Sequence, residues 1–420
     1  MRHLIIGAGP AGVIAAEQLR KHSPTDEITI IGDEPERPYS RMAIPYLLIN
    51  NIDEQGTLLR KSAEHFDQLC IRVVRQRVNK VNAAKSQVTL QDGSVHDYDR
   101  LLIATGSTPI RPPISGMDGS NVHTCWTLAD AREIIKLAKP GAKVVQMGAG
   151  FIGCIIMEAL ASRGVELTVV EMGDRMVPRM MGPSAGGMIK SWCQQKGVRV
   201  ETSAKVDRID HVPGGASQVH LSNGVTLQAD LVISSTGVKP NIGFLQDSGI
   251  DCDAGVLTDD RLQTNQANVF AAGDCAQALD HATGQQVVSA IQPNAADQAL
   301  VAARCMLGLP ASLKRVPQIN VLDTLGLISS SFGQWQGVAG GQHVETVDLQ
   351  NFRLLSLQFD QDRLVGCNAI GWTDHVGVMR GLVEGRVRLG PWKDRLLQDP
   401  TRLMEAYLAR AQAQDQHAAA

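Results

Sequence analysis

A strand–turn–helix–strand unit occurs twice in this chain of 420 residues, and the repetition constrains the fold more than any other feature. The first copy, residues 3–34, carries the turn Gly7-Ala-Gly9-Pro-Ala-Gly12 and ends in the run EITIIGDE. The second copy, residues 143–171, carries the turn Gly148-Ala-Gly150-Phe-Ile-Gly153 and ends in the run ELTVVE. A single GxGxxG turn is common. Two copies in this context, each closed by an acid about 20 residues beyond the third glycine, predict two dinucleotide-binding units.

Each part of this unit has a physical role at a dinucleotide. The first glycine allows a tight turn, the second lets the backbone approach a pyrophosphate, and the third lets the helix pack closely on the strand. The helix N-terminus adds unpaired N–H groups and a positive dipole beside the phosphates. The acid at the end of the second strand stands where a ribose hydroxyl needs an acceptor.

The two closing acids differ in what they predict. Glu171 can accept two hydrogen bonds from a free ribose diol and would repel a 2′-phosphate, which favours NAD over NADP. Arg175, four residues further on, leaves NADP open. In the first copy either Asp33 or Glu34 can accept from a ribose, and we favour Glu34.

Composition and charge exclude several other classes of function. The net charge of -3 gives no basis for a nucleic-acid or membrane-surface hypothesis. The most membrane-like run, Val144 to Ala161, contains three glycines, a glutamine and a glutamate, and it falls short of a spanning helix. The apolar N-terminus resembles a secretion signal, but its glycines have nucleotide-turn spacing. We therefore expect a cytoplasmic protein without membrane insertion.

The eight cysteines are scattered, and the two nearest neighbours, Cys252 and Cys275, are 23 residues apart. Neither a CxxC pair nor a group with zinc or iron–sulfur ligand spacing is present in the sequence. Scattered cysteines of this kind are usually reduced and buried. We expect no bound metal, and we interpret Cys275 as a buried thiol.

The remaining segments predict further strands and helices. Val73 to Tyr98 alternates apolar and polar residues and predicts a small antiparallel sheet, and a similar stretch follows the second copy. The run VFAAGDCAQ reads as a buried strand ending on Asp274, before a helical run from Ala295 to Leu307. From about Gln318 the pattern changes to alternating strands closed by an amphipathic helix, and the tail AQAQDQHAAA is expected to be disordered.

The segments IATGSTP and AAGDCAQ, together with the doubled turn, resemble the FAD-dependent pyridine nucleotide–disulfide oxidoreductase superfamily over nearly the whole chain. Within it, GDEPERPYSR is most similar to the rubredoxin reductase, ferredoxin reductase and nitrite reductase flavoprotein branch. The resemblance implies that NAD binds at Gly148, Gly150, Gly153 and Glu171. It implies that FAD binds at Gly7, Gly9, Gly12, Asp33 or Glu34, Arg41, Thr105, Gly106, Gly273 and Asp274.

The resemblance also implies the domain organisation. The expected fold class is α/β, with two nested Rossmann-like domains, for FAD and NAD, plus a small α+β C-terminal domain. The FAD-binding domain is expected to be discontinuous, at residues 1–112 and 240–317. The NAD-binding domain is expected at 113–239 and a C-terminal interface domain at 318–420.

Three residues depart from the pattern of the family. Met42 stands where related coenzyme A disulfide reductases carry a redox cysteine, and a thioether cannot form a thiolate. Tyr46 replaces a lysine expected near the flavin, so the flavin potential should differ. Ile155 replaces a glutamate expected near the nicotinamide, and Glu158 follows one helical turn later. The first departure argues against disulfide reduction.

The expected chemistry is hydride transfer between NAD and FAD, with no protein side chain in a catalytic role. The electrons are then exchanged with an iron–sulfur partner. The C-terminal run that begins GCNAIGWTDHVG and the helix GCIIME resemble the FAD/NAD subunit of phenylglyoxylate dehydrogenase-type complexes, thiamine-dependent 2-oxoacid oxidoreductases. Two alternatives remain open: a free-standing NADH-dependent rubredoxin or ferredoxin reductase, and a flavin-binding scaffold without activity.

Overall fold

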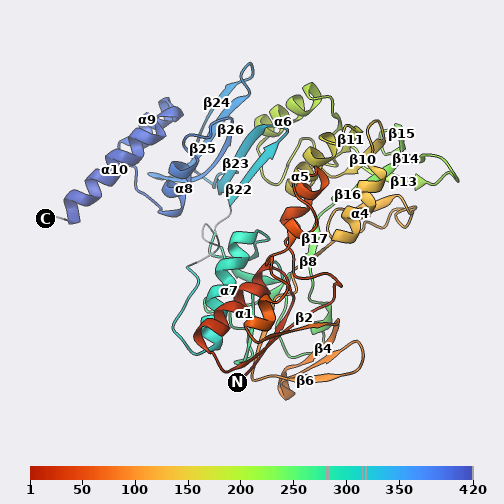
Figure 1. The fold of residues 1–420 in the computed structure, drawn as a ribbon. Coiled ribbons are helices and arrows are strands. Elements are labelled where there is room, and N and C mark those ends of the chain that lie inside the picture. The colour runs from red at the N-terminus through yellow and green to blue at the C-terminus, as the bar shows by residue number, and fades with distance from the viewer. Residues whose placement is uncertain (281–282, 315, 317–318, 419–420) are drawn as a thin grey trace. The chain divides into compact units, whose positions relative to one another are not determined.

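A computed structural model describes residues 1–280, 283–314, 316 and 319–418. The chain forms two compact units, which are considered separately (Figure 1). Unit 1 comprises Met1–Pro109 and Val238–Val316, and unit 2 comprises Ile110–Gly237 and Pro317–Ala420. Because the C-terminal segment belongs to the same unit as the second glycine turn, its status as a separate domain stays a prediction. The predicted boundary at 317/318 lies outside the described residues.

Unit 1 is built on a parallel sheet of five strands in the order β19-β7-β1-β2-β3. These strands are β1 (Arg2–Ile6), β2 (Glu27–Gly32), β3 (Ile71–Arg75), β7 (Arg100–Ile103) and β19 (Val269–Ala271). Helix α1 (Pro10–His22) connects β1 to β2, as the first strand–turn–helix–strand unit predicts. All five strands end at the same edge of the sheet, where binding sites of parallel sheets form.

Strands β1, β7 and β19 are buried along almost their whole length, and since successive side chains of a strand point to opposite sides, both faces of the sheet are covered there. Ile5, Ile30 and Leu102 pack with α1 and with α7 (Gln292–Met306), and the two helices lie side by side in Figure 1. Their neighbours Ile6 and Ile31 belong to a second cluster on the other face. This second cluster packs against the small antiparallel sheet of β4 (Val78–Asn82), β5 (Gln87–Leu90) and β6 (Val95–Asp97). The prediction of this sheet is confirmed from Val78 onward, but its start at Val73 is wrong, because Val73 lies in β3 and pairs in parallel with β2.

Several short elements complete unit 1. The predicted helical run at 295–307 is confirmed as α7. The other strands and helices are α2 (Ile44–Leu48), α3 (His65–Gln68), β8 (Ser107–Pro109), β17 (Val238–Pro240), β18 (Val256–Leu257), β20 (Ala276–Leu279) and β21 (Gln286–Val288).

Unit 2 repeats the parallel plan in its first part, with five strands in the order β12-β11-β10-β16-β9. These strands are β9 (Val122–Thr124), β10 (Lys143–Met147), β11 (Glu166–Val170), β12 (Arg199–Glu201) and β16 (Leu231–Ser234). Helix α5 (Phe151–Ala161) connects β10 to β11, which confirms the second strand–turn–helix–strand unit. The part also contains α4 (Leu128–Leu137), α6 (Pro183–Gln195), β13 (Val206–Asp210), β14 (Ser217–Leu221) and β15 (Thr226–Ala229).

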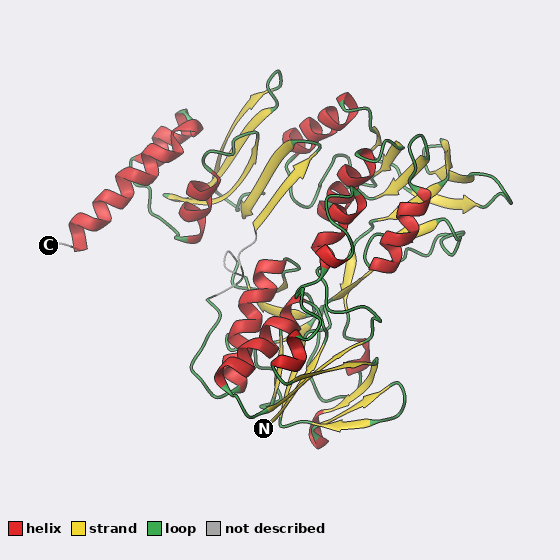
Figure 2. Ribbon diagram, in the orientation of Figure 1, coloured by secondary structure: helices red, strands yellow, loops and turns green. Residues whose placement is uncertain are grey.

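The C-terminal part of unit 2 is an antiparallel sheet in the order β22-β23-β26-β25-β24 (Figure 2). Its core packs the sheet against helices α8 (Val376–Glu384) and α9 (Trp392–Gln398) and the start of α10 (Leu403–Ala418). The strands are β22 (Ile319–Thr324), β23 (Leu327–Gly333), β24 (Gln342–Asp348), β25 (Arg353–Asp360) and β26 (Arg363–Ile370). Helix α5 contacts β22, and α6 contacts β26, so this sheet adjoins the helices around the second glycine turn.

The expectation of a disordered tail is wrong as far as Ala418, because α10 continues to that residue. The tail is rich in alanine and glutamine, which are good helix formers, so its polarity alone misled the prediction. Residues 419–420 lie outside the described residues. Within the part of the chain that the structure describes, every helix is too short or too polar to span a bilayer.

Candidate dinucleotide sites

The first glycine turn has the close approaches that exclude any larger residue. Gly7 has φ +117°, and a Cβ atom there would lie 2.0 Å from the carbonyl oxygen of Ala104. A Cβ at Gly12 would lie 1.9 Å from the carbonyl oxygen of Gly7, so the helix must approach the turn through bare backbone. A Cβ at Gly9, in contrast, would meet no atom within 4 Å. The middle glycine therefore borders open space, where the backbone can approach a pyrophosphate.

The two acids proposed for the first ribose have different surroundings. Asp33 is exposed, whereas Glu34 is partly buried and forms an ion pair of 2.5 Å with the guanidinium of Arg41. The Tyr39 hydroxyl donates to the other oxygen of Glu34 and accepts from Arg41 at 3.0 Å. The RPYSR segment thus converges on Glu34 through both its tyrosine and its arginine. This arrangement favours Glu34 over Asp33 as the ribose acceptor.

The other predicted FAD residues gather at the carboxyl edge of the same sheet. Thr105 and Gly106 follow β7, and Asp274 follows β19, the strand beside it. The Ser107 hydroxyl donates to Asp274 at 2.9 Å, and Thr105 donates to the carbonyl of Asn241 at 2.7 Å. The edge of the unit 1 sheet therefore carries a partly buried carboxylate and a tight turn next to the first glycine loop.

Burial raises the pKa of Asp274 above its ordinary value, and the Ser107 hydroxyl and the charge of Arg41 oppose the rise. Strand β20 follows Asp274, and α7 begins only at Gln292. Helix α7 nevertheless returns to this point, because Gln298 accepts a hydrogen bond of 2.7 Å from the N–H of Gly273. Gly273, the residue before Asp274, is thus held against α7.

The second glycine turn has the same construction in unit 2. Gly148 has φ +96°, and a Cβ there would lie 2.4 Å from the carbonyl oxygen of Ser235. A Cβ at Gly153 would lie 2.5 Å from the carbonyl oxygen of Gly148, and a Cβ at Gly150 would meet nothing within 4 Å. Both turns therefore have two crowded glycines around one that borders open space. This shared geometry fits two dinucleotides.

Glu171 is buried and is tied to the second turn. One carboxylate oxygen accepts from the N–H of Ala149 at 2.7 Å, and the other accepts from the N–H of Gly173 at 2.8 Å. Each carboxylate oxygen has a second lone pair, so the side chain can still accept from a ribose. The guanidinium of Arg175 bonds to Asp174 and to the carbonyl oxygen of Met181. Arg175 is thus engaged within its own loop, which favours the NAD assignment.

The three residues that depart from the family pattern, Met42, Tyr46 and Ile155, lie on short helical segments or on α5. Met42 lies in a short 3₁₀ turn next to Arg41 and is 50% exposed, and Tyr46 in α2 is 56% exposed. Ile155 lies in the first half of α5, and Glu158 follows on the same helix. Burial raises the pKa of Glu158, and so does the charge of Asp323.

All eight cysteines are free thiols, and only Cys70 and Cys252 are exposed. Cys275 is fully buried, and its Sγ contacts the carbonyl oxygens of Ile103 and Ala272 at 3.4 Å. Burial raises the pKa of the Cys275 thiol, and it raises the pKa of Cys125 and Cys193 to about 12. The interpretation of Cys275 as a buried thiol is confirmed. These buried thiols stay protonated near neutral pH.

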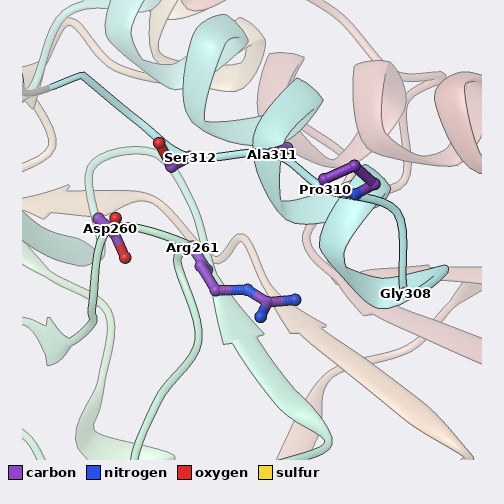
Figure 3. Close-up of a pocket in the computed structure, with 6 residues that line it drawn as sticks. All are labelled: Asp260, Arg261, Gly308, Pro310, Ala311 and Ser312. Atoms are coloured by element: carbon purple, nitrogen blue, oxygen red, sulfur yellow. The ribbon is translucent and has the colours of Figure 1, made fainter.

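A surface pocket of unit 1 lies at the C-terminal end of α7. Its lining is formed by Asp260, Arg261, Gly308, Pro310, Ala311 and Ser312, as Figure 3 shows. Four of these residues follow the C-terminal end of α7, whereas Gly273 bonds to the N-terminal half of that helix. Gln298 stands eight residues before the end of α7, which is about 12 Å along the helix, so the pocket and the Gly273 contact lie at different points of α7. We assign it no role.

Reasoning from sequence missed several residues around the two turns. In unit 1 these are Tyr39 and Ser107, which contact Glu34 and Asp274. In unit 2 they are Gln146, under the second turn, and Asn368, which bonds to the loop after Glu171. A buried glutamine inside the apolar run KVVQM was the one local signal available.

Comparison with known proteins places the chain in a family. A family model described as pyridine nucleotide-disulphide oxidoreductase matches residues 1–299. The chain is 31% identical over 402 residues to a protein of Aromatoleum evansii named NADH-dependent phenylglyoxylate dehydrogenase subunit epsilon, with 95% of each chain covered. It is 26% identical over 388 residues to the rubredoxin-NAD(+) reductase of Pseudomonas putida, covering 91% of this chain and 99% of that one.

Among solved structures, the chain matches putidaredoxin reductase in its covalent complex with putidaredoxin, with a TM-score of 0.89. That match covers 98% of this chain and 99% of the other at 22% identity, which shows the fold alone. The chain belongs to the pyridine nucleotide–disulphide oxidoreductase family. It is an oxidoreductase that uses FAD and NAD, as the resemblance in sequence implied.

Proposed function

We propose that the chain passes electrons between NAD(H) and an iron–sulfur partner, as the FAD/NAD subunit of a larger dehydrogenase complex of the phenylglyoxylate, or 2-oxoacid, type. FAD and NAD supply hydride transfer between the two rings and onward transfer of single electrons. The chain itself binds both dinucleotides, with FAD at the Gly7–Gly12 turn and NAD at the Gly148–Gly153 turn.

The single observation that carries this proposal is that the sulfur-containing side chains near the first turn cannot take part in disulfide chemistry. Met42, next to Arg41, is a thioether, and Cys275, next to Asp274, is a buried thiol with a raised pKa. Neither side chain can form the thiolate that disulfide reduction requires near neutral pH. Electrons that reach FAD therefore leave to a partner outside the chain.

The proposed binding roles follow from the contacts. Glu34 accepts from the ribose of FAD while its ion pair with Arg41 orients the carboxylate, and Asp274 accepts from the ribitol chain. Glu171 accepts from the ribose of NAD while the N–H groups of Ala149 and Gly173 fix its carboxylate. No general acid or base is needed, because hydride transfer requires the two rings to be stacked and shielded from water.

The hypothesis that the chain is a subunit of a larger complex is supported by the extent of its similarity to the phenylglyoxylate dehydrogenase subunit. That alignment covers 95% of both chains and includes the C-terminal sheet, beyond the segment matched by the family model. The alternative is a free-standing reductase of rubredoxin or ferredoxin. It is supported by the rubredoxin reductase alignment, which covers 99% of that protein at lower identity.

Two experiments test the proposal. NADH added without oxygen should bleach the visible absorption of the bound flavin, and a spectrum that stays unchanged would leave only a flavin-binding scaffold. The untagged protein should then be purified from its native source. Co-elution with iron–sulfur and thiamine-binding chains supports the complex subunit. A lone monomer or dimer that reduces rubredoxin or ferredoxin with NADH contradicts it and establishes the free-standing reductase.

A further inference from the structure

Gln146 is a fully buried polar residue directly beneath the second glycine turn. It is the fourth residue of β10, and its side-chain Nε2 donates to the carbonyl oxygen of Gly148 at 3.0 Å. The same Nε2 donates to the carbonyl oxygen of Gly153 at 2.9 Å. One carboxamide therefore connects the first and third glycines of the turn.

The first copy of the unit provides an internal comparison. Ile5 is the fourth residue of β1 and stands two positions before Gly7, as Gln146 stands two positions before Gly148. A Cβ at Gly12 would lie 3.3 Å from the side chain of Ile5, and a Cβ at Gly153 would lie 3.2 Å from Nε2 of Gln146. The two side chains thus occupy the same place, one apolar and one polar.

The fold of the turn does not require this polar group. Ile5 fills the place with no hydrogen-bonding atom and is fully buried. At Gln146 the side-chain oxygen Oε1 is buried, and no partner for it is found among the described residues. A buried amide oxygen without a partner costs stability, so a glutamine at this position stabilises the fold less than an aliphatic residue would. Its two donated bonds call for another explanation.

The contacts of the neighbouring peptide groups suggest one. In the peptide that joins Gly148 to Ala149, the carbonyl accepts from Gln146 and the N–H donates to Glu171. The carbonyl of Ala149 accepts from the N–H of Val177 at 2.8 Å. Two successive peptide planes of the turn are therefore held from outside before a ligand binds.

We propose that Gln146 is a positioning residue that fixes the second glycine turn in its binding conformation and so raises the affinity for the pyrophosphate of NAD. This inference rests on the proposed assignment of NAD to that turn. Gln146 acts on the carbonyl side of the turn, and the N–H groups at the start of α5 are left directed toward the pyrophosphate. Fixing the backbone in advance removes part of the ordering cost of binding.

The variant Gln146→Met tests the proposal, because methionine has a similar length and volume but donates no hydrogen bond. Loss of two donated bonds should weaken binding of NADH and of ADP-ribose by about tenfold. The limiting rate of flavin reduction at saturating NADH should stay unchanged, because the residue does not contact the reacting rings. Thermal stability should fall only slightly, because the removal of the unpartnered Oε1 offsets part of the cost of leaving the carbonyl groups of Gly148 and Gly153 without this donor. The control Ile5→Met makes the same replacement in the first copy and should leave the NADH affinity unchanged.

Three other outcomes would overturn the proposal. If the folded variant binds ADP-ribose with wild-type affinity, Gln146 has only a structural role. The same conclusion follows if Ile5→Met weakens NADH binding as much as Gln146→Met does. If wild-type protein binds neither NADH nor ADP-ribose, the NAD assignment itself fails, and this result is obtained before any variant is made.

Discussion

Asn368 and Gly182, 186 residues apart, are joined by a hydrogen bond of 2.9 Å from the Gly182 N–H to the Asn368 side-chain oxygen. The Asn368 amide also donates to the carbonyl of Met180 at 3.0 Å. Asn368 is buried on β26, and Gly182 ends the loop that begins after Glu171. The C-terminal sheet therefore fixes the loop that follows the proposed ribose acceptor.

Replacing Asn368 by leucine should loosen this loop. The N–H of Gly182 and the carbonyl of Met180 would lose their side-chain partner, so we expect a loss of about 1–3 kcal/mol in the free energy of unfolding. The loop also holds Val177, whose N–H bonds to the second glycine turn, so NADH affinity should fall as well. Denaturant unfolding and NADH titration measure the two effects. Asn351→Leu, at an exposed turn, is the control, and an equal loss in both variants would contradict the prediction.

The two middle glycines should separate the two cofactors. A side chain at Gly9 or Gly150 enters open space, and both residues have negative φ, so valine fits the backbone at either position. Gly9→Val should yield protein without flavin. Gly150→Val should yield protein with a full complement of flavin. Its affinity for NADH should be at least tenfold lower, which is a loss of about 1.4 kcal/mol in binding free energy. The flavin spectrum and an NADH titration measure the cofactor content and the NADH affinity of each variant. Loss of flavin in Gly150→Val would contradict the assignment of FAD to the first turn and NAD to the second.

Glu158 should make the stability of the folded protein depend on pH. Burial and then the charge of Asp323 raise its pKa, and a hydrogen bond from the Leu325 N–H opposes the rise only in part. A carboxyl group with a raised pKa in the folded state is most favourable below its unfolded pKa of about 4.3, and the benefit is lost as the pH rises through the folded value.

Glu158→Gln should therefore leave the melting temperature nearly unchanged at pH 4 and raise it at pH 7. Glutamine stays neutral and can still accept from Leu325. Thermal denaturation at several pH values measures the difference between variant and wild type. Glu166→Gln, an exposed replacement on β11, should show no such trend. A stabilisation that is equal at both pH values would refute the charge argument.

The exposed thiols should be dispensable. Cys70 and Cys252 are the two cysteines that reagents can reach in the folded chain. Alkylation of both, or their replacement by serine, should leave the rate of NADH-driven flavin reduction and of electron delivery to an acceptor unchanged. Mass spectrometry confirms the modification. A loss of activity that follows alkylation of either cysteine would show that a thiol takes part in electron transfer.

The sequence predicted those parts of the fold that depend on local pattern. The turns at Gly7 and Gly148, the helices that follow them and the small sheet from Val78 all carry their information in neighbouring residues. The family resemblance predicted Gly7, Thr105 and Asp274 as FAD residues, and the structure places them after β1, β7 and β19, at one edge of the sheet.

Other features could not be predicted because they depend on contacts between distant segments. Nothing near Asn368 indicates that its partners are Met180 and Gly182. Strands β20 and β21 separate Asp274 from α7, and at four and three residues they are too short to show a strand pattern in the sequence. Gln146 is a local anomaly in an apolar strand, but its meaning depends on carbonyl groups that only the folded turn brings together.

The central claim is that FAD is the only redox centre through which this chain accepts electrons from NADH. The most direct measurement is a reductive titration with NADH in the absence of oxygen, with flavin absorbance followed to its end point. We predict complete bleaching at about one NADH per FAD, because a flavin accepts two electrons. An end point at about two NADH per FAD would contradict the claim, because a second two-electron centre, such as a disulfide, would then be present.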